Sequence, residues 1–233
     1  MDIPHIVEDG KMASYNAEQW LARSKEVQVP KSVFNDMIMN YLIIHGYQST
    51  AQKFSQEADM NPNIDLHSLG ERRHIVRLIH EGDIQGAVEK INEVNPELLD
   101  RKPDLHFALL RLQLIELIKH GYEDGDIQPA LDFASSHLAQ RAAGPNNPQF
   151  LADLEKAMAL ICFPPDALVP SLKELTDVKL RRTIAEQVNT ELMESQELSV
   201  ERKIENLTQL WAWGESNLET HVNFPKLKKK DLL

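Results

Sequence analysis

Nine histidines are the side chains from which this 233-residue chain could build a metal site. His67, His74 and His80 lie nearest to one another, but no two of them are four residues apart. That spacing is the one that aims two imidazoles of one helix at a single ion. Surface or helix-capping roles are therefore favoured, and we expect neither a metal nor another cofactor.

Cys162 is the single cysteine and the one candidate thiol nucleophile. It stands in the apolar run 160–163, with no histidine or basic residue beside it. Such surroundings favour a buried, inert thiol over an activated thiolate. One cysteine also excludes a RING module, whose zinc sites need several thiolates at paired spacings.

Common catalytic motifs are missing from the sequence. It has no G-x-x-x-x-G-K-[ST] phosphate loop, no G-x-S-x-G elbow, no H-E-x-x-H zinc helix and no glycine-rich dinucleotide turn. The carboxylate pairs Glu57 with Asp59 and Glu123 with Asp124 lie in polar segments, where they are expected only to solvate the surface. We therefore predict a protein that is not an enzyme.

Charge and hydropathy exclude two further classes of partner. The formal net charge is −11, from 36 acidic and 25 basic residues, so a phosphate backbone would be repelled and nucleic-acid binding is disfavoured. The most apolar stretch, 105–118, is interrupted by Arg111, Gln113 and Glu116 and is too short to cross a membrane. The segment 1–5 has no basic start or apolar run of a signal peptide, which predicts an intracellular protein.

Helices are the elements that must position any functional residue. Apolar residues make up 42% of the chain, aromatic residues 6%, and there are only 9 glycines, a composition that favours an all-α fold. The spacing predicts roughly nine or ten helices in antiparallel pairs. A loop is expected at 121–125 and a linker at 141–148, and the expected helices span 32–46, 49–58, 68–82, 83–95, 104–120, 127–138, 151–161, 180–192 and 204–211.

The first helix pair has the clearest pattern. An i, i+3, i+4, i+7, i+8 apolar stripe precedes a closing Gly46. Ser49 and Gln52 then form a capping box for the second helix, and Ser68 and Glu71 form another for the helix that follows. The stripe can pack either on the following helices of the chain or on another chain, and periodicity alone does not separate these alternatives. Its residues are Phe34, Met37, Ile38, Tyr41 and Leu42, followed in the second helix by Tyr47, Ala51, Phe54 and Ala58.

Three successive segments resemble one known family. The run 35–42 with Gly46, Tyr47, Ala51, Phe54 and Glu57 resembles a LisH motif. The run from Arg72 through 82–84 and 96–99 to 114–118 resembles a CTLH segment. The segments 130–134, 159–160 and 210–212, together with Glu155, resemble a CRA domain. The resemblance implies an N-terminal segment, partly disordered, at 1–31, LisH at 32–64, CTLH at 68–126, CRA at 127–222 and a basic tail at 223–233.

The resemblance is to the small scaffold subunits of the glucose-induced-degradation (CTLH) E3 ubiquitin ligase. It implies a non-catalytic scaffold in proteasome-dependent degradation, located in cytoplasm and nucleus. The implied partners are RING subunits, a Ran-binding protein M-like SPRY/LisH receptor subunit and an armadillo-repeat subunit, in a homo- or hetero-oligomer. The alternative is a LisH homodimer acting in a cytoskeletal or transcriptional complex.

The resemblance also implies which residues form the contacts. Two departures from the family pattern, 164–167 and the longer connection at 121–125, are those of a diverged paralogue. The CRA aromatic residues could each belong to a core or to an interface. The expected LisH interface is Phe34, Met37, Ile38, Tyr41, Leu42, Tyr47, Ala51 and Phe54, and the candidate CRA interface is Trp211, Trp213 and Phe224.

Overall fold

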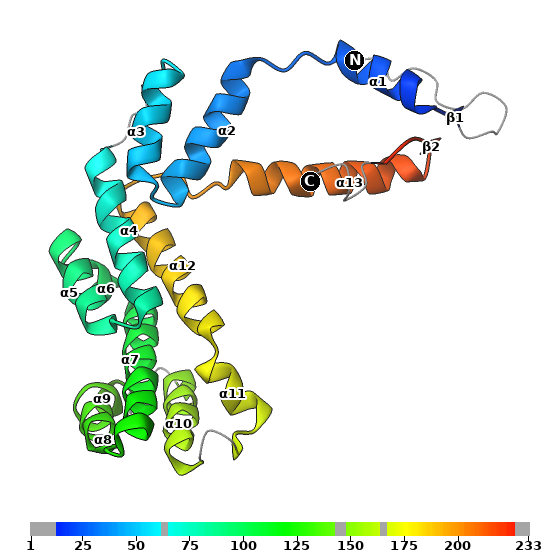
Figure 1. Ribbon diagram of the computed structural model, residues 1–233. Helices are drawn as coiled ribbons and strands as arrows, with labels where there is room; N and C mark the ends of the chain where they lie inside the picture. Colours follow the sequence, from blue (N-terminus) through cyan, green and yellow to red (C-terminus); the bar gives the residue numbers. More distant parts are fainter. Residues whose placement is uncertain (1–12, 62–64, 143–147, 164–166, 227–233) are drawn as a thin grey trace. The chain divides into compact units, whose positions relative to one another are not determined.

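The computed structural model describes residues 13–61, 65–142, 148–163 and 167–226, and these residues are almost entirely helical (Figure 1). The all-α prediction is therefore confirmed. The chain forms two compact units. Unit 1 consists of 1–44, 50–62 and 201–233, and unit 2 of 45–49 and 63–200.

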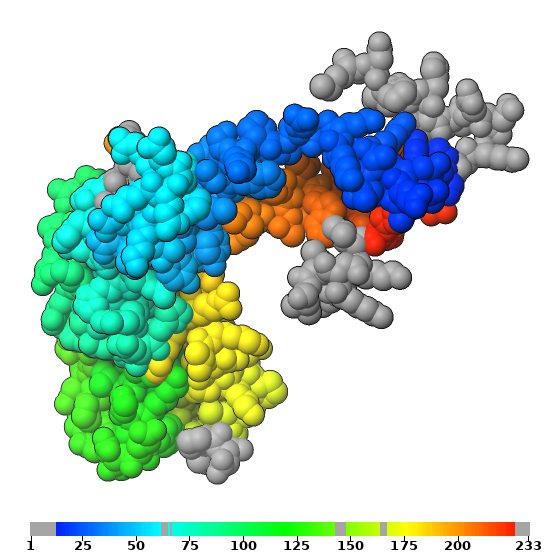
Figure 2. Space-filling view, turned by 45° about the horizontal axis from the view of Figure 1, so that its top comes forward, coloured from blue at the N-terminus to red at the C-terminus, as the bar shows by residue number. Residues whose placement is uncertain are grey.

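Unit 2 is built around one long buried helix, α7 (Pro103–Asp124). One apolar cluster surrounds its first half and a second cluster its second half, so α7 belongs to both cores. The central helix expected at 104–120 is thus confirmed. Its neighbours form a closely packed body in the space-filling view (Figure 2), and they are α4 (Leu66–Glu81), α5 (Ile84–Val94), α6 (Leu98–Arg101), α8 (Gln128–Phe133), a π-helical turn (Ala134–Leu138), α9 (Ala139–Ala142), α10 (Pro148–Cys162), α11 (Pro170–Thr176) and α12 (Val178–Ser195).

The junction between α4 and α5 forms as its residues predict. Gly82 ends α4 with φ +91, a left-handed conformation that suits glycine. Asp83 then caps α5, because its Oδ1 accepts a hydrogen bond from the Gly86 amide at 2.9 Å. The start of α4 differs from the prediction: Asp65, not Ser68, is the cap, and its Oδ1 accepts from the His67 amide at 2.9 Å.

The loop predicted at 121–125 is wrong, because α7 continues to Asp124. Gly121 is buried within the helix, where a Cβ would lie 2.7 Å from the carbonyl oxygen of Asp126. Its lack of a side chain therefore permits a close backbone approach and does not mark a turn. Gly125 ends the helix with φ +78.

The linker predicted at 141–148 falls mostly on 143–147, outside the described residues; α9 ends at Ala142 and α10 begins at Pro148. The departure at 164–167 likewise lies outside them except for Ala167.

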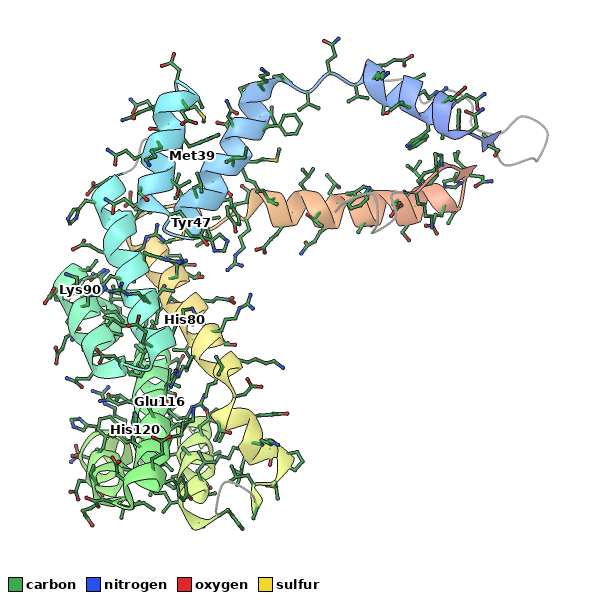
Figure 3. All side chains as sticks on the ribbon, viewed as in Figure 1. Met39, Tyr47, His80, Lys90, Glu116 and His120 are labelled. Atoms are coloured by element: carbon green, nitrogen blue, oxygen red, sulfur yellow. The ribbon has the colours of Figure 1, made fainter. Side chains whose placement is uncertain are left out.

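A buried ion pair joins three helices of unit 2. Glu116 of α7 is 5% exposed, and Arg181 of α12 donates to both of its carboxylate oxygens, at 2.9 and 2.6 Å. Arg181 also donates to the carbonyl of His80 at 3.0 Å, near the end of α4; Figure 3 labels Glu116 and His80. Burial works to raise the pKa of the Glu116 carboxyl, but the hydrogen bonds and charges of Arg181 and Lys119 outweigh it and lower that pKa.

Unit 1 contains the first and last helices of the described chain. Its elements are a two-residue strand β1 (Ala13–Ser14), α1 (Ala17–Glu26), α2 (Lys31–Ile44), most of α3 (Gln48–Glu57), α13 (Lys203–Glu219) and a second short strand β2 (Val222–Asn223). The two strands pair in parallel, Ala13 beside Val222. No strand was expected from the sequence, because these segments are too short to show an alternating pattern.

Candidate interaction surface

One face of α2 carries three large apolar side chains that are exposed. Phe34 is 49%, Ile38 41% and Tyr41 42% exposed. Their i, i+4, i+7 spacing places them on the same side of the helix. These residues belong to the predicted LisH interface, and their exposure leaves them accessible to a partner.

The other predicted LisH residues lie elsewhere. Leu42 and Ala51 are buried, as are Met39, Ile43 and Ile44. Met37 and Phe54 are half-buried. Tyr47 is 37% exposed, lies in the turn before α3 and belongs to unit 2.

The last helix, α13, has no buried residue at all. Ile204, Leu207, Trp211 and Leu218 are exposed, and Gly214 between them has open space where a Cβ would stand. Spacings of three and four residues alternate along this row, which is the seam of a helix that packs lengthwise on another helix. Leu210, 61% exposed, flanks the row, whereas Trp213, 65% exposed, lies two positions after Trp211 and points to nearly the opposite side of α13.

The helices α2 and α13, which carry these exposed faces, belong to one unit. The two helices contact each other, and the Lys203 amide donates to Asn40 Oδ1 at 3.2 Å. This hydrogen bond joins the first turn of α13 to α2. A soluble chain rarely exposes so many large apolar side chains together unless they bind something. We call the set Phe34, Ile38, Tyr41, Ile204, Leu207, Leu210, Trp211 and Leu218 the α2/α13 surface.

Phe224, the third CRA candidate, lies differently from the two tryptophans. It is half-buried and stacks on Trp20, with ring centroids 4.9 Å apart and an interplanar angle of 24°. The Tyr15 amide donates to the Asn223 carbonyl at 2.8 Å, and the Arg23 guanidinium lies 4.9 Å from the centre of the Tyr15 ring. Phe224 therefore joins the segment after β2 to α1, whereas Trp211 and Trp213 face solvent.

Cys162 is exposed, so the prediction of a buried thiol is wrong. Leu160 and Ala157 form the buried side of α10, and a residue two positions after Leu160 points about 200° away around the helix. Tyr122 anchors this end of α10 by donating to the Phe163 carbonyl at 2.7 Å. Burial raises the pKa of the Tyr122 hydroxyl, and the nearby Cys162 adds to the effect.

Within the part of the chain that the structure describes, His, Cys, Asp and Glu side chains form no group of three that could hold a metal ion. In the same ranges, none of the helices has the length and apolar character that a membrane crossing requires. The exposed apolar faces are therefore the feature from which a function can be argued.

Most of the chain matches two known protein families. Residues 68–219 match the family described as "CTLH/CRA C-terminal to LisH motif domain". Residues 35–58 match the LisH family. The chain belongs to the CTLH/CRA family.

Two relatives of this CTLH/CRA chain match about nine tenths of its length. It is 35% identical over 210 residues to "Protein GID8 homolog" of Arabidopsis thaliana, covering 90% of this chain and 84% of that protein. It is 36% identical over 212 residues to "GID complex subunit 8" of Schizosaccharomyces pombe, covering 89% and 88%. A shorter match, 35% over 88 residues, covers 38% of this chain and 16% of "Ran-binding protein 9" of Xenopus tropicalis. The chain is thus a GID8-like member of the family, as its sequence indicates.

Proposed function

We propose that this chain is a non-catalytic subunit of a GID/CTLH-type E3 ubiquitin ligase and that the α2/α13 surface docks it onto a LisH-containing subunit. The observation that carries the proposal is the solvent exposure of a whole row of large apolar side chains on α13 and of a second row on α2, a helix that contacts α13. Burial of such rows against a matching pair of helices would stabilise an assembly by removing apolar area from water.

The similarity to GID8 homologues supports the choice of assembly. One relative is named as a subunit of the GID complex, and the matched region spans about nine tenths of this chain. The partial likeness to Ran-binding protein 9 supports a receptor subunit of that kind as the LisH partner. RING subunits and an armadillo-repeat subunit would occupy other faces of the chain.

The contribution of such a subunit to ubiquitin transfer is positional. Holding a substrate receptor and the RING subunits on one scaffold turns their encounter into an intramolecular event with a raised effective concentration. No residue of this chain need touch the reacting bond. The proposal therefore places no catalytic step here.

The test is quantitative mass spectrometry of proteins that co-purify with the tagged chain from cells. The perturbing variant is Phe34→Asp with Ile38→Asp, since both side chains are exposed and the changes should leave the fold intact. Leu42 is unsuitable because it is buried and its replacement by Asp would unfold the helix pair. Circular dichroism at 222 nm checks the fold of each variant.

A matched control places the same two charges on unit 2. Leu151→Asp with Val178→Asp also replaces two exposed apolar residues. We expect the α2 variant to lose the SPRY/LisH receptor subunit and to keep the RING subunits on other faces, while the control retains all of them. Recovery of all subunits with the α2 variant would refute this docking surface, and a wild-type chain that recovers only copies of itself would favour the homodimeric adaptor.

Location in both cytoplasm and nucleus is part of the proposal. Lys226 pairs with Glu219, whereas Lys228, Lys229 and Lys230 lie outside the described residues. A cluster of this kind can serve as a nuclear localisation sequence. Deleting 226–230 should lower the nuclear fraction in fluorescence microscopy; an unchanged fraction would remove this part of the proposal.

A further inference from the structure

A basic recess of about 400 Å³ lies in unit 2, apart from the α2/α13 surface. One wall is the turn 46–49, which contains Tyr47 (labelled in Figure 3). The other wall is one side of α4, where Gly70, Arg73, His74 and Arg77 follow at helical spacing. Its volume falls within the range of about 300–1,000 Å³ that ligand pockets occupy.

Arg73 is held in place by groups that leave its charge unneutralised. Its guanidinium lies 4.9 Å from the centre of the Tyr47 ring. Its Nη1 donates to the His45 carbonyl in a long hydrogen bond of 3.4 Å. Among the described residues, Arg73 has no carboxylate within ion-pair distance. A guanidinium fixed by a ring and a carbonyl is ready to bind an anion with little loss of side-chain entropy.

Arg77 adds a second cation on the same wall. Its Nη2 lies 3.1 Å from His74 Nδ1, and its Nε lies 3.6 Å from Glu81 Oε1. The Arg77 and Glu81 side chains are 61% and 59% exposed. An ion pair with that exposure contributes little, so an incoming oxyanion can replace Glu81 at a small cost.

The wall formed by the turn 46–49 supplies neutral hydrogen-bonding groups. Ser49 is exposed, and the Gln48 side chain lies directly over Gly70, whose missing Cβ makes room for it. A hydroxyl and an amide beside two guanidinium groups form the donor set that carboxylate and phosphate oxygens bind. An apolar ligand in the recess would bury these polar groups without hydrogen-bond partners, which would cost binding free energy.

We propose that this recess binds the carboxylate or phosphate groups of a short acidic segment of a partner protein. The chain has a formal net charge of −11, which repels extended polyanions. Arg73 and Arg77 form a local cationic site on this acidic chain. A short peptide with a few anionic side chains can bind in the recess, because it carries too little charge to be strongly repelled by the rest of the chain. The proposal stands on the recess alone and does not depend on the ligase assembly.

The test uses defined peptides and the full chain. The probes are fluorescein-labelled AEESEEA, the same peptide with phosphoserine, and the neutral AQQSQQA, each titrated by fluorescence anisotropy. Because the chain has only 9 glycines, ¹⁵N-glycine labelling also gives a simple spectrum in which Gly46 and Gly70 report from the recess. We expect the acidic peptides to bind, the neutral one not to, and these two amide signals to shift.

The decisive variant is Arg73→Gln with Arg77→Gln. It should weaken binding of the acidic peptides about tenfold or more, a loss of about 1.4 kcal/mol or more. The control, Arg101→Gln with Arg182→Gln, removes the same net charge from two exposed arginines of unit 2, each 74% exposed, and should bind as the wild type does. Equal loss in both variants, or no shift of Gly46 and Gly70, would overturn the proposal.

The phosphorylated peptide separates the two sources of oxyanion. Tighter binding than its serine counterpart would identify a phosphorylated segment as the ligand, and equal binding a carboxylate-rich one; both support the site. No binding of either peptide at millimolar concentration would contradict it.

Discussion

Replacing Arg181 by Met should destabilise unit 2 by about 3 kcal/mol, near the lower end of what breaking a buried ion pair costs. The variant keeps the length of the side chain but removes every donor. Glu116, whose side chain is 7% exposed, then loses two hydrogen bonds of 2.9 and 2.6 Å, and the His80 carbonyl loses one of 3.0 Å. Lys119 remains 3.3 Å from Glu116, and the Arg181 side chain is itself 22% exposed, which together keep the loss near that lower end.

Denaturant unfolding followed by circular dichroism at 222 nm measures this loss. The three tryptophans, Trp20, Trp211 and Trp213, all lie in unit 1. Tryptophan fluorescence therefore reports on unit 1, and a change confined to unit 2 should appear in the dichroism. Hydrogen exchange should also quicken at the end of α4 and in α12.

The matched control removes both charges. In Glu116→Leu with Arg181→Leu no buried group is left unpaired, so most of the stability should return. A loss below about 0.5 kcal/mol in Arg181→Met, or a double variant as unstable as the single one, would refute the assignment of this ion pair as the junction of α4, α7 and α12.

The pH dependence of stability follows from the same pair. Arg181 and Lys119 lower the folded-state pKa of Glu116 in spite of burial. Its contribution is therefore present above the unfolded value of about 4.3 and is lost as the pH falls through the folded pKa. The stability difference between wild type and Glu116→Gln should shrink as the pH falls below about 5; a difference that grows on acidification would contradict the sign.

Three smaller perturbations test other parts of the fold. Asp83→Ala removes the cap of α5 and should cost about 1 kcal/mol in denaturant unfolding, whereas Asp83→Asn should be nearly neutral. Gly82→Ala places a side chain at φ +91 and should cost at least about 1 kcal/mol; a stabilising effect would exclude the left-handed cap. Trp20→Ala should quicken hydrogen exchange around Phe224, and unchanged exchange there would argue against the stacked pair.

Local patterns in the sequence predicted helices well where the cause was local. Asp83 caps α5 because its side chain reaches an amide three residues away. The same reasoning failed at Ser68, since Asp65 stands upstream and starts the helix earlier. It failed again at Gly121, where a glycine serves a close approach to Asp126 and does not form a turn.

Features that depend on contacts between distant residues could not be predicted from local patterns in the sequence. The Glu116–Arg181 pair joins residues far apart in the chain, and neither position is unusual in its own helix. The LisH-like stripe predicts a helix pair but not which of its residues face outward: Leu42 is buried and Ile38 is exposed. The sequence predicts the last helix, which contains Ile204, Leu207 and Trp211, but only the fold shows that no residue of this helix is buried.

Hydrogen exchange of this chain, free and within the assembly that co-purifies with it from cells, tests the central claim most directly. The account predicts that peptides covering 31–44 and 203–219 become protected in the assembly, at the exposed faces of α2 and α13. Protection elsewhere with no change in these two helices would contradict the α2/α13 surface as the site of docking.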